Sequence, residues 1–298
     1  MNVPVLCIVF NRPRETQILV DTLLKANVGP IYFSCGGPRG EQDEDSVNAV
    51  RSIITDAPWT VDIQTRFQDK NLGCRRNIID AIDWILSIHD FAIILEDDVI
   101  PEPSFFPYCI EMSQRFSNEN SIMMITGLNE LGHYSPRGGS YFCTTGGTWG
   151  WGTWARAWEL MDRDFRILDK EEAAENLSWY RTHIPRQVNR VLKGYEATKR
   201  GLVDTWDYEW ALTRMSHRGF SIAPASNLIS NIGTGKNATH TRKLTTLTPP
   251  TAPLTFPLVH TPINQPEWEY LLNVEAKNHK NIVQQNLNML RLRIRKLV

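Results

Sequence analysis

Three consecutive carboxylates, Glu96-Asp97-Asp98, follow directly after the apolar segment 91–95. Three adjacent negative charges repel one another, and a hard divalent cation offsets that repulsion. Mg²⁺ and Mn²⁺ bind one or two carboxylates and complete their shell with phosphate oxygens and water. The triplet therefore predicts a metal and phosphate site, and the simpler interpretation is that Asp97 or Asp98 only caps the turn before Pro101.

A group of polar and cationic residues ends the apolar segment 3–10 in the same abrupt way, at Asn11, Arg12 and Arg14. In an open parallel sheet, ligands bind beyond the carboxyl ends of the strands. If both apolar segments are strands of one such sheet, the cations and the carboxylate triplet lie on the same edge.

Two later segments carry further candidates for binding phosphate. Gly233-Thr234-Gly235-Lys236 has glycines that let a backbone approach a phosphate and a cation to follow them, although an ordinary glycine turn has the same composition. Arg75 and Arg76 begin the helix expected after Asn71-Leu72-Gly73, and each either binds phosphate or is a solvated surface residue.

The elements that must position these residues alternate regularly over 1–98. Apolar runs predict strands at 3–10, 31–33, 61–63 and 91–95, and helical spacing predicts helices at 15–26, at 46–54 and from 74. Four strand and helix alternations predict an α/β fold with a mainly parallel, Rossmann-like sheet flanked by helices on both faces.

After residue 98 the regular alternation of strands and helices ends. We expect helices at 103–116, 154–160 and 206–218, a buried strand at 122–125 and a glycine-rich loop at 138–152. Six prolines in 245–267 predict an extended arm, and apolar residues at 4-3-4-3 spacing predict a C-terminal helix over 274–298. From Leu271 onward the net charge is +5. This basic helix would rest on an anionic membrane, pair with a second copy in a homodimer, or dock on its own domain.

Tryptophan is concentrated in the middle of the chain, since seven of the ten lie between 149 and 210. Flat aromatic faces stack on the apolar faces of sugar rings, and Trp149 and Trp151 stand in a glycine-rich segment that could present them. The competing interpretation is a secondary core lined with tryptophan.

Composition excludes several classes of protein. With 298 residues and 42% hydrophobic residues the chain forms one large domain or two small ones. Lys and Arg total 32 against 33 Asp and Glu, which removes the electrostatic argument for a nucleic-acid binder. Five widely spaced cysteines without a CxxC pair argue against a disulfide framework and a zinc site. Neither a signal peptide nor a membrane-length apolar run is apparent, so we expect a cytoplasmic protein.

Three segments, taken in order, resemble one known group of enzymes. They are Phe10-Asn11-Arg12-Pro13 with 93–99, then Trp206-Asp207-Tyr208-Glu209-Trp210, then 231–240. Together they resemble nucleotide-sugar glycosyltransferases of the GT-A fold, in particular the N-acetylglucosaminyltransferase I type and similar bacterial nucleotide-diphospho-sugar transferases. The resemblance runs from Val3 to about Thr241. It implies a GT-A domain at 1–244, with a nucleotide-binding half at 1–98 and an acceptor and catalytic half at 99–244, followed by the arm and helix at 245–298.

The resemblance also implies roles for individual positions. Asp98 would bind the metal, Asp97 would face the ribose, Glu96 would face the donor sugar, and Phe10, Asn11, Arg12 and Arg14 would lie at the donor, with Arg12 on the nucleotide. Lys236 and Thr239 would meet the phosphates, Arg75 would assist them, and His240 would lie beside Thr239 or near the metal. Asp207 would be the catalytic base, although Glu209 is the alternative because two adjacent acids are usual in the transferase I type. Trp149, Trp151 and Trp206 would face the acceptor. Cys35-Gly36 stands where that type has an acid for base recognition.

These roles imply an inverting glycosyltransferase that depends on Mn²⁺ or Mg²⁺. It would move a hexosyl or N-acetylhexosaminyl group from a nucleotide-diphosphate donor, UDP-sugar above all, to a hydroxyl of a glycan or lipid-linked acceptor in bacterial cell-surface polysaccharide synthesis. A sugar nucleotidyltransferase is one alternative, but it needs a glycine-rich loop where Asn11-Arg12-Pro13-Arg14 stands. A non-catalytic carbohydrate-binding protein built on the tryptophans is the other.

Overall fold

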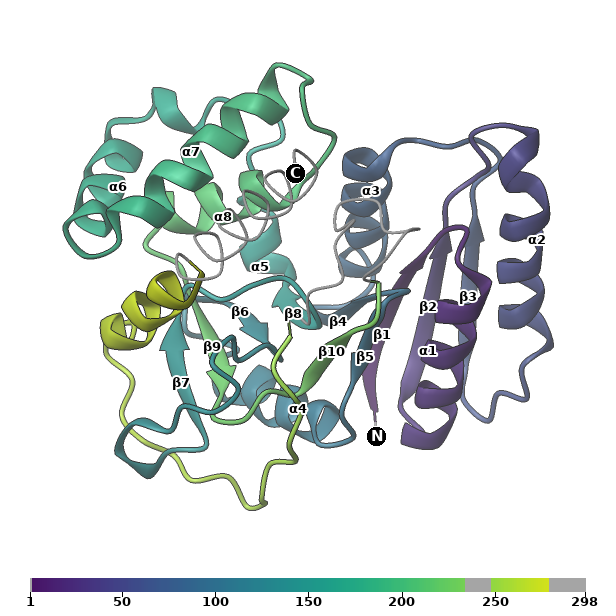
Figure 1. Ribbon diagram of the computed structural model, residues 1–298, viewed down its shortest axis with the longest axis horizontal. Helices are drawn as coiled ribbons and strands as arrows, with labels where there is room; N and C mark the ends of the chain where they lie inside the picture. Colours follow the sequence, from purple (N-terminus) through teal and green to yellow (C-terminus); the bar gives the residue numbers. More distant parts are fainter. Residues whose placement is uncertain (1, 234–247, 279–298) are drawn as a thin grey trace, which may run out of the picture.

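An eight-stranded sheet forms the centre of the computed structural model, which describes residues 2–233 and 248–278 (Figure 1). The strand order is β3-β2-β1-β4-β8-β6-β9-β7. The strands are β1 (Asn2–Val9), β2 (Gly29–Cys35), β3 (Ile63–Phe67), β4 (Phe91–Glu96), β6 (Ile122–Thr126), β7 (Tyr141–Thr144), β8 (Trp151–Trp154) and β9 (Phe220–Pro224). Only β8 and β7 run antiparallel to their neighbours in this sheet. The predicted α/β class with a mainly parallel sheet is therefore confirmed.

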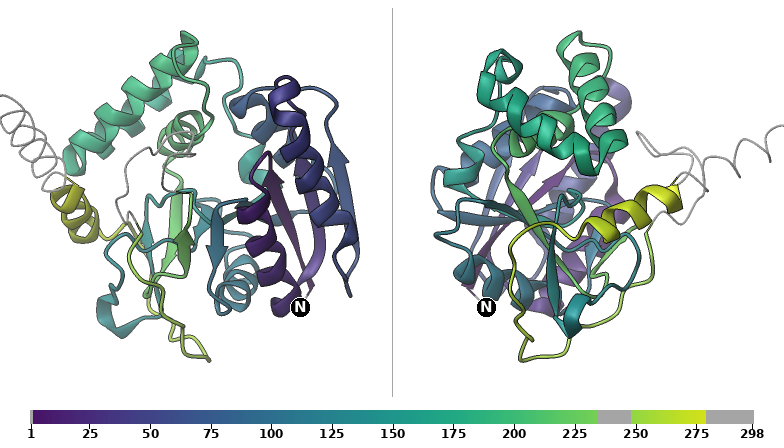
Figure 2. Two further views of the ribbon diagram at one scale, coloured as in Figure 1. Left: turned by 45° about the vertical axis from the view of Figure 1, so that its right-hand side comes forward. Right: turned by 90° about the vertical axis from the view of Figure 1, so that its left-hand side faces the viewer.

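Helices cover both faces of the sheet, as the alternating pattern predicts (Figures 1 and 2). They are α1 (Pro13–Ala26), α2 (Glu41–Asp56), α3 (Cys74–Leu86), α4 (Phe105–Arg115), α5 (Ala155–Trp158), α6 (Glu171–His183), α7 (Pro185–Lys199) and α8 (Asp207–Ser216). Residues of β1 alternate between two cores: Cys7 packs in the cluster of α1 and α2, and Leu6 packs in the cluster of α3. Because β1 is buried on both faces, its sequence is an almost unbroken apolar run.

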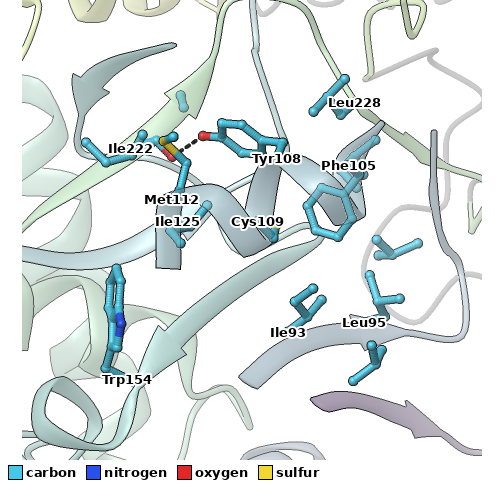
Figure 3. Packing of buried hydrophobic residues seen from close by; sticks show 14 of the residues in the cluster. Ile93, Leu95, Phe105, Tyr108, Cys109, Met112, Ile125, Trp154, Ile222 and Leu228 are labelled. Atoms are coloured by element: carbon cyan, nitrogen blue, oxygen red, sulfur yellow. Dashed lines mark hydrogen bonds between the residues drawn. The ribbon is translucent and has the colours of Figure 1, made fainter. Parts of the chain in front are cut away.

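Helix α4 packs in the same hydrophobic cluster as α1 and α2 (Figure 3). Phe105, Tyr108 and Met112 face Ile93 on β4 and Ile222 on β9, and all are completely buried. The Tyr108 hydroxyl donates to the carbonyl oxygen of Ile222 at 3.1 Å, which satisfies its one polar group inside the core.

The expected loop at 138–152 is wrong in part, because it contains β7 and the first residues of β8. All four residues of β7 are buried. In β8, Gly152 sits so close to Phe91 that a Cβ there would approach the ring to 2.5 Å. The glycine is therefore a packing requirement of a strand, and it does not mark a loop. The expected helix from Trp154 is only the single turn α5.

Helices α6 and α7 occupy a stretch for which the sequence patterns above predict no element. Both show helical burial, with Ala173, Leu177 and Tyr180 inward on α6, and Val191 and Tyr195 inward on α7. Together with α8 they form a layer on the side of the sheet that carries α3 and α5 (Figures 1 and 2).

The proline-rich arm follows the second half of the sheet. A short two-stranded sheet, β5 (Val99–Pro101) with β10 (Ile229–Asn231), precedes it in the chain. Over 248–267 the arm has no helix or strand, and its backbone bonds to the domain at Asn227, Ser140 and Cys143. Residues 268–278 are helical, so the last helix starts before the expected residue 274, and 279–298 lie outside the described residues. Within the described ranges, none of the helices has both the length and the apolar character needed to cross a bilayer.

Candidate active site

A cavity of about 800 Å³ opens where β1, β2 and β4 end and where α3 and α8 begin. The sequence-predicted residues that line it are Phe10, Asn11, Arg12, Glu96, Asp97, Asp98, Trp149, Trp206 and Asp207. They come from segments up to about two hundred residues apart, and the parallel strands place the first six at one edge as expected. The cavity thus contains cations, carboxylates and aromatic rings together.

Arg12 ties the carboxylate triplet to the end of β1. One guanidinium nitrogen lies 2.9 Å from Asp97 Oδ1 and 2.8 Å from Asp98 Oδ2. Burial alone would lower the pKa of Arg12, but the two carboxylates together raise it. Burial, followed by the charges of Asp98 and Asp97, raises the pKa of Glu96 to about 8, and Arg12 opposes that increase. A full negative charge on every member of the triplet is therefore unfavourable with one guanidinium beside it.

The donor chemistry of this cluster fits a hard divalent cation. Asp97 and Asp98 supply carboxylate oxygens, and Arg12 already lies between them as a positive group. Across the described ranges, three His, Cys, Asp or Glu side chains nowhere converge as a metal-binding group. One or two carboxylates suit Mg²⁺ or Mn²⁺, which fill their shell with phosphate and water. Gly233 lies against Asp98, since a Cβ at Gly233 would reach Asp98 Oδ2 at 1.9 Å.

Asp207 and Glu209, the two candidate bases, have different environments. Asp207 begins α8 and lines the cavity, where its carboxylate accepts a hydrogen bond from the Thr205 hydroxyl. Glu209 has no exposed surface and forms an ion pair with Arg75 at 2.6 Å. Burial raises the pKa of Glu209, although the hydrogen bond and charge of Arg75 oppose the increase.

Several sequence candidates lie away from the cavity or beyond the described residues. Arg75 points to Glu209, and the exposed Arg14 is not among the lining residues. Lys236, Thr239 and His240 fall in 234–247, outside the described part of the chain.

The tryptophans divide between core and cavity. Trp151 is 1% exposed and stacks on Trp206 with ring centroids 5.3 Å apart, so Trp151 lies in the core behind the cavity wall. Trp158 and Trp210 complete that buried cluster. Trp149 and the largely buried Trp206 line the cavity itself.

Sequence patterns missed a group of polar residues in the part of the cavity near the ends of β1 and β2. Asn77, from the second turn of α3, lines the cavity beside Gly36, and its buried Oδ1 has no hydrogen-bond partner. Arg39 lies over the Phe10 ring at 5.2 Å and is fixed by Asp43, whose pKa it lowers to about 2 through hydrogen bonds. The segment 71–73 does predict the start of the helix that carries Asn77. Helical spacing alone, however, does not show which polar residue of that helix faces a ligand.

Asp204 and Tyr208 also line the cavity and were not among the sequence candidates. Asp204 accepts hydrogen bonds from the backbone N–H groups of Cys74 and Arg75 at 2.6 and 3.1 Å. These contacts join residues about 130 positions apart, so local spacing could not reveal them.

Comparisons with known proteins find solved structures that are similar to this chain only at low sequence identity and low TM-score. No family model matches the sequence, and no curated protein matches it. UDP-glucose pyrophosphorylase in complex with UDP-glucose is 10% identical, with a TM-score of 0.40 over 80% of this chain and 96% of the other. Mouse xyloside xylosyltransferase 1 is 9% identical, with a TM-score of 0.38 over 72% and 81%. The 4-diphosphocytidyl-2C-methyl-D-erythritol synthase from Anaerococcus prevotii is 8% identical, with a TM-score of 0.34 over 57% and 77%.

Proposed function

We propose that the chain is an inverting glycosyltransferase that takes a nucleotide-diphosphate sugar as donor. One observation carries the proposal: a single cavity is lined both by the Arg12 and carboxylate cluster and by Asp207 with its aromatic neighbours Trp206 and Tyr208. The first group has the chemistry to bind a diphosphate with a divalent cation. The second has the chemistry to take a proton from a hydroxyl.

The donor side offers groups for each part of a nucleotide. Arg12 is a fixed guanidinium that can donate to a phosphate, and Asp98 is the proposed metal ligand. The unpartnered Asn77 Oδ1 can accept an N–H of a nucleobase or a hydroxyl of a ribose. When bound, Mg²⁺ or Mn²⁺ would neutralise part of the charge that develops on the leaving diphosphate.

Asp207 is the proposed general base. In the proposed reaction the acceptor oxygen bonds to the anomeric carbon, and its proton passes to an Asp207 oxygen. The bond between the anomeric carbon and the diphosphate oxygen breaks, and its electron pair leaves with the diphosphate. A positioned carboxylate contributes about 10²–10⁴-fold to such a step. Two neighbouring carboxylates already have strong partners: Asp204 accepts from the start of α3, and Glu209 is paired with Arg75. Asp207 has one neutral hydroxyl partner and faces the cavity.

The aromatic side of the cavity fits a sugar acceptor. Trp149 and Tyr208 line the same cavity as Asp207, and ring faces of this kind pack against the apolar faces of sugars. We propose a glycan or lipid-linked glycan as acceptor on this basis.

Isothermal titration calorimetry with UDP-, GDP- and dTDP-sugars tests the donor side directly. With Mn²⁺ present, the wild type should bind at least one of them, and Asp98→Ala should lose metal-dependent binding. Asp45→Ala, which removes an exposed carboxylate on α2, is the matched control and should bind as the wild type does. The proposal fails if no nucleotide sugar binds, and the metal assignment fails if Asp98→Ala binds unchanged.

A further inference from the structure

The first turn of α3 holds the segment around Asp207 at two points, one on each side. Before Asp207, the Asp204 carboxylate accepts from the backbone N–H groups of Cys74 and Arg75. After Asp207, the Arg75 guanidinium donates to both oxygens of Glu209, at 2.6 and 2.7 Å. Asp207 thus lies between two anchors that are both made by residues 74 and 75.

Burial and a two-bond ion pair fix the position of Glu209. Glu209 is completely buried, and the Arg75 side chain is 26% exposed. A buried carboxylate without a partner is expensive, so the two-bond pair restricts where α8 can lie. Arg75 is itself fixed, because its guanidinium lies 4.9 Å from the centre of the Phe165 ring and donates to the carbonyl oxygen of Arg163 at 3.1 Å.

The anchor at Asp204 depends on the close approach of two loops. A Cβ on Gly73 would lie 2.7 Å from Asp204 Oδ2, and Gly73 has a φ of +80° that favours glycine. The N–H groups at the start of a helix carry partial positive charge, so a carboxylate is stabilised there. The segment around Asp207 is therefore held to the start of α3. Because α3 leads directly into β4 and its carboxylates, this contact connects Asp207 with the proposed nucleotide-binding half.

We propose that Arg75, Glu209 and Asp204 are positioning residues, which fix the carboxylate of Asp207 relative to the donor site through their contacts at the start of α3. The proposal rests on the proposed function for the role of Asp207 as base. A misplacement of about 1 Å in a catalytic group reduces turnover by about 10²-fold, which sets the scale of the effect. Arg75 then acts on turnover, and it leaves the affinity for the donor unchanged.

The test compares Arg75→Lys and Glu209→Gln with the wild type. Lysine keeps the charge but loses the two-bond geometry, and glutamine keeps the shape but loses the charge. The readouts are donor affinity by calorimetry and release of UDP, with water as acceptor, from whichever UDP-sugar binds. We expect donor affinity within about twofold of wild type and turnover reduced by about 10- to 100-fold, with an unchanged shape of the pH profile. Asp204→Asn, which keeps an acceptor oxygen for the α3 N–H groups, should give a smaller loss of turnover.

A matched control exists on the same helix. Arg66 pairs with Asp80 of α3 at 3.1 Å, an arginine–carboxylate contact on this helix away from Arg75 and outside the cavity lining. Arg66→Lys should leave donor affinity and turnover unchanged. Amide hydrogen exchange supplies a readout that needs no turnover: in Arg75→Lys, residues 204–210 should exchange faster than in the wild type and in the control.

Other results would contradict either the positioning role or the proposed function. If Glu209→Gln abolishes turnover as completely as Asp207→Asn, Glu209 is the base and the positioning role is wrong. If Arg75→Lys weakens donor binding by tenfold or more, Arg75 is a donor ligand. Unchanged exchange over 204–210 also overturns the proposal. Failure of the wild type to bind any nucleotide sugar would instead count against the proposed function, and the exchange experiment would still decide whether α3 fixes this segment.

Discussion

A glycine in the middle of α7 gives a prediction whose sign differs from the general rule. Gly194 lies under the ring of Tyr208, the residue after Asp207 on α8. A Cβ at Gly194 would approach Cγ, Cδ1 and Cδ2 of that ring to 2.4 Å each. Exchange of glycine for alanine inside a helix normally stabilises a protein by about 0.5–1 kcal/mol. Here the added methyl group meets the inner part of the ring, which moves away only if χ1 of Tyr208 or the backbone of α8 changes.

The magnitude follows from that distance. The ring must move by about 1 Å to restore ordinary contact, and overpacking of this kind costs about 1–3 kcal/mol. After subtraction of the helical gain, Gly194→Ala should lower the free energy of unfolding by up to about 2.5 kcal/mol. Because the displaced ring adjoins Asp207, turnover should fall more than donor affinity does.

Urea unfolding of four proteins measures this prediction as a double-mutant cycle: wild type, Gly194→Ala, Tyr208→Ala and the double variant. Alanine at 194 should destabilise the wild type and stabilise the protein that lacks the Tyr208 ring, which gives a coupling energy of about 1–3 kcal/mol. If Gly194→Ala stabilises both backgrounds equally, the contact does not govern how α7 and α8 pack.

Two further predictions concern the walls of the cavity. Arg39 lowers the pKa of Asp43 to about 2, so this pair adds stability that is complete above about pH 4 and is lost as the pH falls from 4 to 2. The pKa difference limits the effect to about 2 kcal/mol, and solvent reduces it because the Arg39 side chain is 56% exposed; urea unfolding at pH 5 and pH 2.5 should show a smaller pH effect in Asp43→Asn than in the wild type. Gly233→Ala would push a methyl group onto Asp98, so we expect Mn²⁺ affinity in the presence of UDP to fall by about tenfold or more with little change in Tm, and unchanged affinity would remove Asp98 from the metal site.

The parallel half of the sheet was predictable because its strands are buried on both faces. Continuous apolar runs such as 3–10 and 91–95 identify such strands, and the edge at which they end follows from topology alone. The sequence therefore predicts that Arg12 and the carboxylate triplet lie at one edge of the sheet, and in the structure they are in contact. Strand β8 was missed because Gly152 meets a packing need from Phe91, which only the folded structure reveals.

The part of the cavity around Asp207 was predictable only in part, because its contacts cross long stretches of sequence. The aromatic segment 206–210 predicts Asp207 as the base and leaves Glu209 as the alternative. Burial and the partner Arg75, 134 residues away, distinguish the two carboxylates. The stacking of Trp151 behind Trp206 likewise depends on how β8 meets α8, and no spacing in the sequence reports it.

We expect one cavity to bind a nucleotide sugar between Arg12, Asp98 and Asp207. A crystal structure with Mn²⁺ and an unreactive UDP-sugar analogue tests this most directly. The diphosphate should lie beside Arg12, the metal should lie on Asp98, and the anomeric carbon should face the space in front of Asp207. A nucleotide bound outside this cavity, or a sugar turned away from Asp207, would contradict it.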